Sequence, residues 1–271
     1  MRTFPSLLLF SSLAIAAFSP FAAVAAPSLV VSEAGPFHYA SALAAPGGVR
    51  LASSNGGIEV SASTDGKLDV HAVVRGGDPS QVRVIAREEA GGVAICVLFT
   101  EESPDRCHLS GLSGQSSGIN HHNAPSVDLI ARVPAGVSLF ATSLNGAIHA
   151  RGLTAEARAT TLNGDVEVSA GTVPEATTQN GSVEVTCTKP PAGSASFTTT
   201  NGNVRVTYPS GLDADVDAST VNGEISSSFP MTIASTPFGH GPKSGHARVG
   251  KGGAHVTVHS VNGNVEVRSR D

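Results

Sequence analysis

A four-residue pattern, Ser or Thr, any residue, Asn and Gly, occurs seven times and constrains the fold of this chain more than any other feature. Each copy leads directly into a segment in which Val or Ile alternates with other residues. Between Asn145 and Asn222 the steps from one Asn to the next are 18, 17, 21 and 21 residues. Such a period indicates a stacked repeat architecture. The Asn-Gly pairs are Asn55, Gly56, Asn145, Gly146, Asn163, Gly164, Asn180, Gly181, Asn201, Gly202, Asn222, Gly223, Asn262 and Gly263.

Alternating residues on both sides of each Asn-Gly predict two short β-strands per repeat. Val137, Leu139 and Ala141 precede one copy, and Val166 and Val168 follow the next, so these side chains would face one narrow interior. Gly supplies the positive φ of a sharp corner, Asn tolerates left-handed geometry, and stacked Asn side chains can bond from one repeat to the next. A series of Asn-Gly hairpins in an ordinary sheet is the alternative. The period favours an all-β, right-handed-type β-solenoid of about 20-residue, two-strand coils with an N-terminal β region.

The beginning of the chain predicts export. Arg2 is followed by an apolar run over 7–18 and by Ala23-Val24-Ala25, the pattern of a secretory signal peptide cut after Ala25. No later apolar stretch approaches the roughly 20 residues that a spanning helix needs, so we expect no transmembrane segment and a periplasmic or extracellular protein. The expected divisions are a signal peptide (1–25), an N-terminal β region with one repeat and a disulfide loop (26–130), and a β-solenoid repeat region (131–271).

Composition narrows the core and the partners. Hydrophobic residues make up 40% of the chain but aromatic residues only 4%, which favours thin β layers of Val, Ala, Ile, Leu and Thr. A formal net charge of −5 argues against nucleic acid as a partner. Of the three cysteines, Cys96 and Cys107 flank a turn-rich segment, so a disulfide closing that loop is the preferred pairing. Cys187 would then remain free and buried.

The outward positions of the strands carry charged side chains. If the repeats at Asn163 and Asn180 are neighbours, Glu167 and Glu184 stack about 4.8 Å apart, close to the roughly 5 Å between the carboxyl groups of retaining glycosidases. Mutual repulsion would raise the pKa of one of them. The next repeat supplies Arg205, and we prefer a solvated, non-catalytic face. The candidate binding face consists of Glu167, Glu184, Arg205, Asp215 and Asp217.

The histidines do not predict a metal centre. His255 and His259 lie four residues apart on the outward face of one expected strand, which places their Cα atoms about 13 Å apart, too far to share a zinc ion. Only His240 and His246, in an expected loop, could move together. We therefore expect no metal, no cofactor and no catalytic residue.

Three further patterns have ordinary explanations. Asp213, Asp215 and Asp217 alternate along one strand about 7 Å apart, unlike the curled loop of a calcium site. The segment 114–118 matches the nucleophile elbow of hydrolases, but it lies in a polar loop with no helix pattern after it. The segment 229–253 interrupts the repeats where one coil is missing, and is either a contact-bearing insertion or a detour.

The Asn-Gly-x-Val repeats, the isolated upstream copy and the signal peptide together resemble the bacterial putative-adhesin family, a domain of unknown function. The resemblance covers about Val49 to Val267, implies a β-solenoid-like fold, and brings no catalytic residues. We expect an exported, non-enzymatic, adhesin-like module that binds a cell-envelope glycan or a surface protein. The alternatives are a polysaccharide-active β-helix enzyme using Glu167 and Glu184, and a structural protein that assembles through its open end. The oligomeric state stays open.

Overall fold

The computed structural model describes residues 29–33, 36–112, 125–235 and 241–270. Apart from two short 3-10 helices, η1 (Pro79–Gln81) and η2 (Pro104–Arg106), the regular structure in these ranges is entirely β. None of the helices found there is long and apolar enough to cross a membrane. The predicted signal peptide and its cleavage site lie outside the described residues.

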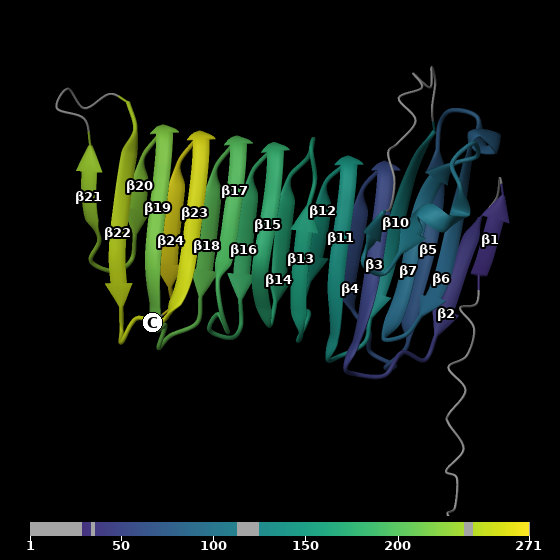
Figure 1. Cartoon of the computed structure of the whole chain (residues 1–271), viewed down its shortest axis with the longest axis horizontal. Coiled ribbons are helices and arrows are strands. Elements are labelled where there is room, and N and C mark those ends of the chain that lie inside the picture. Colours follow the sequence, from purple (N-terminus) through teal and green to yellow (C-terminus); the bar gives the residue numbers. More distant parts are fainter. Residues whose placement is uncertain (1–28, 34–35, 113–124, 236–240, 271) are drawn as a thin grey trace, which may run out of the picture.

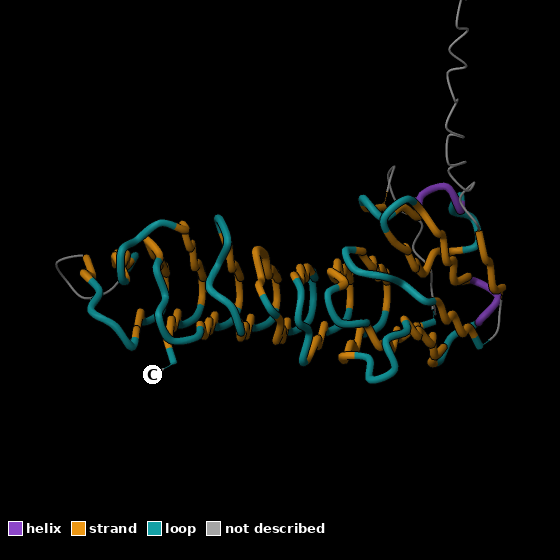
Figure 2. Tube along the Cα trace, turned by 90° about the horizontal axis from the view of Figure 1, so that it is seen from below, coloured by secondary structure: helices purple, strands orange, loops and turns teal. Residues whose placement is uncertain are grey.

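Two long sheets face each other and form two layers joined by loops (Figures 1 and 2). In spatial order, sheet A contains β1 (Leu29–Glu33), β6 (Val82–Glu89), β7 (Gly92–Phe99), β3 (Gly47–Asn55), β11 (Val137–Asn145), β13 (Glu156–Thr160), β15 (Thr172–Asn180), β17 (Ala195–Asn201), β23 (Ala254–Asn262), β19 (Ala214–Asn222), β22 (Lys243–Val249) and β21 (Thr232–Ser235). Sheet B contains β2 (Phe37–Ser41), β5 (Leu68–Arg75), β10 (Ser126–Val133), β4 (Ile58–Ala62), β12 (Ile148–Arg151), β14 (Val166–Ala170), β16 (Val183–Cys187), β18 (Val204–Tyr208), β24 (Val265–Ser269) and β20 (Ile225–Ser227). A small third sheet pairs β8 (Cys107–His108) with β9 (Gly111–Leu112).

Each repeat forms one rung, with its first strand in sheet A and its second strand in sheet B. The Asn-Gly pair turns the chain from one sheet to the other, and equivalent residues of neighbouring rungs are register partners, as Val183 and Val204 are. The strands of neighbouring rungs run parallel, whereas antiparallel pairs occur toward the ends of the sheets. The prediction of an all-β, β-solenoid-like fold is confirmed at this level.

The spatial order of the rungs differs from their order in the chain. β23, from the last repeat, pairs in parallel with β17 on one side and β19 on the other, and β24 lies between β18 and β20 in the same way (Figure 1). The last repeat is therefore an interior rung, inserted between two repeats that are consecutive in sequence.

The described residues of the segment 229–253 extend sheet A, and they do not leave the stack as an insertion or a detour would. The segment contains β21 and β22, and β22 pairs antiparallel with β19 along the edge that the last rung leaves open. These two strands extend sheet A, so the interval of 40 residues from Asn222 to Asn262 holds a terminal hairpin and not a degenerate copy. Residues 236–240, between these two strands in the sequence, lie outside the described residues.

The isolated upstream repeat joins the same stack. Its strands β3 and β4 pair in parallel with β11 and β12, and the intervening segment adds β5, β6 and β7 to the N-terminal ends of the two sheets. One buried cluster extends from Phe37 to Val267. The predicted division at residue 130 falls inside β10, and both sheets continue across it.

Small apolar side chains fill the space between the sheets, as the composition predicted. Val, Ala, Leu and Ile occupy most inward positions, and the largest fully buried side chains are Tyr208 and Phe197. Along most strands of the repeats the buried positions alternate with more exposed ones, as in β19. Burial of this alternating set fixes the register, because a slip of one residue would turn every apolar side chain outward.

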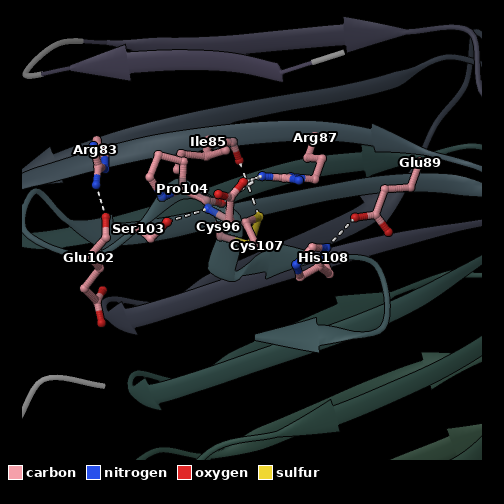
Figure 3. Close-up of polar contacts among 11 residues, drawn as sticks. Arg83, Ile85, Arg87, Glu89, Cys96, Glu102, Ser103, Pro104, Cys107 and His108 are labelled. Carbon is pink, nitrogen blue, oxygen red and sulfur yellow. Dashed lines mark hydrogen bonds and ion pairs between the residues drawn. A yellow bond between two sulfur atoms is a disulfide. The ribbon is translucent and has the colours of Figure 1, made fainter. Parts of the chain in front are cut away.

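A second small core lies on the outer side of sheet A. Ile85, Leu98 and the two cysteines of the disulfide Cys96–Cys107 are buried together there, which explains why β7 is buried on both faces. Polar contacts tie the covering segment down (Figure 3). Arg87 donates to the Pro104 carbonyl at 3.1 Å and to Asp105 at 2.9 Å, His108 lies 2.9 Å from Glu89, and buried Glu102 pairs with Arg106.

We expect the double variant Cys96→Ser, Cys107→Ser to lose about 3 kcal/mol in the free energy of unfolding. A disulfide that closes a short loop lowers the conformational entropy of the unfolded chain, and the loss of this effect costs about that much stability. The two cysteines are 11 residues apart. Urea denaturation measures the change. The wild-type chain in reductant is the control and should match the variant; an unchanged unfolding midpoint in both would contradict a stabilising role.

Candidate functional site

The Asn-Gly corners form a continuous hydrogen-bonded ladder along one edge of the stack. From Asn145 to Asn222 in spatial order, each Asn after the first donates its side-chain amide to the Asn of the rung before it. The donors are Asn163, Asn180, Asn201, Asn262 and Asn222, whose Nδ2 atoms lie 2.7, 2.7, 2.8, 2.9 and 2.8 Å from Oδ1 of the rung before. Asn55, in the first rung, donates instead to the Pro125 carbonyl at 3.3 Å. These amides are used within the stack, which gives the ladder a structural role.

The Ser or Thr of the pattern has a role that sequence reasoning missed. In six of the seven copies its buried hydroxyl donates to the Gly carbonyl of a neighbouring rung, as Thr199 does to Gly181 at 2.8 Å. The Gly is required mainly by close approach: a Cβ on Gly202 would lie 2.0 Å from the Gly181 carbonyl oxygen. Asn201 is the last residue of strand β17, where it is the register partner of Asn180.

A row of outward side chains crosses sheet B with one member per rung. Glu167 and Glu184 are register partners on β14 and β16, and Arg205 follows on β18. The sequence therefore placed these three residues correctly as neighbours. In spatial order the row is Glu59, His149, Glu167, Glu184, Arg205, Glu266 and Ser226.

Arginines bridge the carboxylates of this row. Arg151 binds Glu167 through two hydrogen bonds of 3.0 and 2.9 Å, and these bonds lower the pKa of Glu167. The pKa of Glu167 therefore moves in the direction opposite to the increase that repulsion between the two carboxylates was expected to cause. Arg205 lies 2.7 Å from Glu266 and 3.7 Å from Glu184, so one guanidinium links the carboxylates of two flanking rungs.

The surface around Glu184, Arg205 and Glu266 forms a shallow groove of about 360 Å³, which we call the sheet-B groove. Its floor spans β16, β18, β24 and β20, with Arg205 on the second of these strands. The lining residues are Ser182, Val183, Glu184, Asn203, Val204, Arg205, Glu224, Ser226, Asn264 and Glu266. Asn264 and Glu266 were not among the predicted face residues, because the last repeat was not expected between the rungs at Asn201 and Asn222.

One wall of the sheet-B groove is itself a ladder of polar side chains. At two corners of this wall the residue after the Gly accepts from the backbone of the neighbouring rung: the backbone amide of Asn264 donates to Asn203 Oδ1 at 2.8 Å, and that of Glu224 donates to Asn264 Oδ1 at 2.9 Å. These bonds fix the amide side chains at the rim. The groove is therefore lined by polar groups whose positions are set by the stack.

The other two predicted face residues lie on the opposite side of the molecule. Asp215 and Asp217 belong to β19 of sheet A, because residues before an Asn-Gly corner enter sheet A and residues after it enter sheet B. Arg248 binds Asp215 at 2.8 Å and lowers the pKa of that carboxyl. His246 and His255 flank Asp217 at 2.8 and 3.3 Å. The five predicted residues thus form two separate sets: Glu167, Glu184 and Arg205 lie on sheet B, and Asp215 and Asp217 lie on sheet A.

Cys187 is buried beside Tyr208 in a hollow of about 270 Å³ between the sheets. Burial raises the pKa of its thiol to about 11, which keeps it protonated and unreactive at neutral pH. The hydrolase-like segment 114–118 and His240 lie outside the described residues.

The family model described as Toastrack DUF4097 matches residues 126–268. Two solved structures are similar: a putative cell adhesion protein from Clostridium sporogenes ATCC 15579 (10% identity, TM-score 0.41) and a putative adhesin from Bacteroides fragilis NCTC 9343 (11% identity, TM-score 0.32). The similarity covers 87% of this chain in both cases, and 100% and 97% of the respective solved chains. No curated protein matches the chain.

Proposed function

The chain belongs to the Toastrack DUF4097 family, as its repeats indicated, and we propose that it is an exported, non-enzymatic, adhesin-like module that binds a cell-envelope glycan along the sheet-B groove. The observation that carries the proposal is the groove itself. It crosses four neighbouring strands and presents amides, hydroxyls, carboxylates and one central guanidinium at successive rungs.

The chemistry of the sheet-B groove suits a chain of hydroxyl groups. Neighbouring strands lie about 4.8 Å apart, so equivalent donors and acceptors repeat along the groove as sugar units repeat along a glycan. Arg205 offers several N–H donors in a fixed plane, and Glu184 and Glu266 hold that plane in place. A fixed donor loses little side-chain entropy on binding, which favours affinity.

Export is supported by two independent features. The N-terminal sequence has the signal-peptide pattern, and the disulfide Cys96–Cys107 belongs to an oxidising compartment such as the periplasm or the exterior. A glycan of the cell envelope is within reach in either place.

The contacts of Glu167 favour binding over hydrolysis. A general acid of a glycosidase needs a raised pKa, whereas the two bonds from Arg151 lower the pKa of Glu167 and occupy both of its oxygens. An enzyme built on Glu167 and Glu184 is therefore the weaker proposal, and the experiment below distinguishes it by sugar release.

We expect the mature chain, residues 26–271, to sediment with insoluble envelope polysaccharide or peptidoglycan without releasing sugar. Arg205→Ala should weaken this binding about tenfold or more, since a central arginine is a frequent hot spot. The matched control is Arg158→Ala on sheet A, which also contacts two glutamates and is similarly exposed, at 45% against 50% for Arg205. Binding that is equal in both variants would exclude the sheet-B groove. Released sugar would favour the enzyme, and concentration-dependent size in light scattering would favour assembly.

A further inference from the structure

Three metal-ligating side chains converge near the N-terminal edge of sheet B, on strands that lie outside the sheet-B groove. They are His38 on β2 and Asp69 and His71 on β5. His71 Nε2 lies 2.9 Å from Asp69 Oδ1, and His38 Nε2 lies 3.4 Å from Asp69 Oδ2. One ligand atom from each residue lies within 4.8 Å of the other two. We call these three residues the His-Asp-His cluster.

Strand pairing brings this cluster together. His38 and His71 are direct partners in the antiparallel pair of β2 and β5, and their rings stack with centroids 4.3 Å apart and planes 7° apart. Asp69 precedes His71 by two residues and therefore lies on the same outer face of the strand. Both imidazoles consequently present Nε2 to one carboxylate, on rigid elements of the sheet.

One oxygen of this carboxylate lacks a hydrogen bond. Asp69 Oδ1 is shielded from solvent, and within the described residues it has no hydrogen-bond partner, because His71 Nε2 is near but not in hydrogen-bond geometry. A shielded carboxylate oxygen without a partner is unfavourable. A bound cation would supply that partner.

We propose that the His-Asp-His cluster binds a divalent transition-metal ion, with Zn²⁺ as the best fit. Zinc binds imidazole nitrogen and carboxylate oxygen at about 2.0–2.2 Å, which places neighbouring ligands of a tetrahedral ion about 3.4 Å apart. The two N···O separations in the cluster, 2.9 and 3.4 Å, are close to this value. Two nitrogen ligands disfavour Ca²⁺ and Mg²⁺, which prefer oxygen.

No neighbouring cation occupies the carboxylate of the His-Asp-His cluster in the described part of the chain. Arg132 on β10 is the register partner of Asp69, but its side chain is exposed and no ion pair joins the two among the residues that the structure describes. The histidine side chains are about half exposed, 54% for His38 and 47% for His71, so both can adjust to a metal from solvent. In the sequence the cluster is visible as Asp69-x-His71, an aspartate and a histidine two residues apart on one strand face.

Calorimetric titration of the metal-free mature chain, produced without a histidine tag, tests the proposal with zinc chloride as the probe. We expect one zinc ion per chain, and His38→Ala and His71→Ala should each weaken binding about tenfold or more. Cobalt(II) provides a second readout, since a site with two imidazoles and a carboxylate should give the visible absorption of tetrahedral cobalt, and His71→Ala should abolish it.

The matched control is the double variant His246→Ala, His255→Ala, which removes the two histidines around Asp217 on sheet A. It should bind zinc as the wild type does. Circular dichroism confirms that each variant is folded. The proposal is overturned by absence of saturable zinc binding, or by binding that persists without His38 and His71.

Discussion

Gly202→Ala is expected to lower the free energy of unfolding by about 4 kcal/mol, the sum of backbone strain and a forced shift of one rung. Gly202 has φ of +152°, a conformation that residues with a Cβ rarely adopt. Its added Cβ would lie 2.0 Å from the carbonyl oxygen of Gly181 and 2.5 Å from the carbonyl carbon. That carbonyl also accepts from Thr199, so a shift to relieve the clash would strain a buried hydrogen bond as well.

Thermal and urea denaturation of purified Gly202→Ala measure this effect, and a chain of this size should lose on the order of 10 °C in Tm. Gly193→Ala is the control, because its added Cβ meets no atom within 4 Å and its φ is not in the left-handed region. Gly193→Ala should remain within about 0.5 kcal/mol of the wild type. Equal stability of the two variants would show that the rungs separate easily, contrary to the ladder of contacts at the corners.

The corner residues explain why the fold class could be predicted from sequence. Each Asn-Gly copy forms a corner, and the alternating apolar residues on both sides of it determine which side chains are buried. The structure of every rung is therefore specified by residues close together in the sequence. Thr199, Gly202 and Val204 illustrate this. The Thr199 hydroxyl donates to the neighbouring rung, Gly202 has no side chain that would clash with it, and the Val204 side chain is buried. Local chemistry of this kind is visible in a single sequence.

The order of the rungs could not be predicted, because the same local chemistry makes the rungs interchangeable. Asn262 fits between Asn201 and Asn222 in the Asn ladder with hydrogen bonds of 2.9 and 2.8 Å, similar in length to the 2.7 and 2.8 Å of the other steps. The residues of the repeats do not determine which rung lies next to which. The pairing of β22 with β19 provides the missing information, since it occupies the outer edge that the last repeat would otherwise take.

The same ambiguity limited prediction of the candidate site. Glu184 and Arg205 come from repeats that are consecutive in both sequence and space, and they were identified as neighbours. Glu266 binds Arg205 from a rung 61 residues later, and that contact depends on the inserted repeat. Sites formed within consecutive rungs are therefore predictable here, and sites formed across the insertion are not.

Val258→Asp is expected to destabilise the chain by about 4 kcal/mol or more, because it places an unpaired charge in an apolar interior. Val258 is fully buried on β23, with Phe197 of β17 and Ala218 of β19 as its register partners. In a stack that followed sequence order, damage to the last repeat would loosen one end only. In this topology β19, β20, β21 and β22 are attached to the other rungs through β23 and β24, so the whole group should be released.

Hydrogen exchange of Val258→Asp, followed strand by strand, distinguishes the two orders. Protection should fall in β19 as well as in β23, while β15, two strands from the damage on the other side, should retain more of it, because β15 keeps β13 as a partner. Ile233→Asp on the terminal strand β21 is the control: its side chain is 47% exposed, so the substitution should cost no more than about 0.5 kcal/mol. Unchanged protection in β19 would contradict the inserted position of the last repeat, since β19 has no other parallel partner among the described strands.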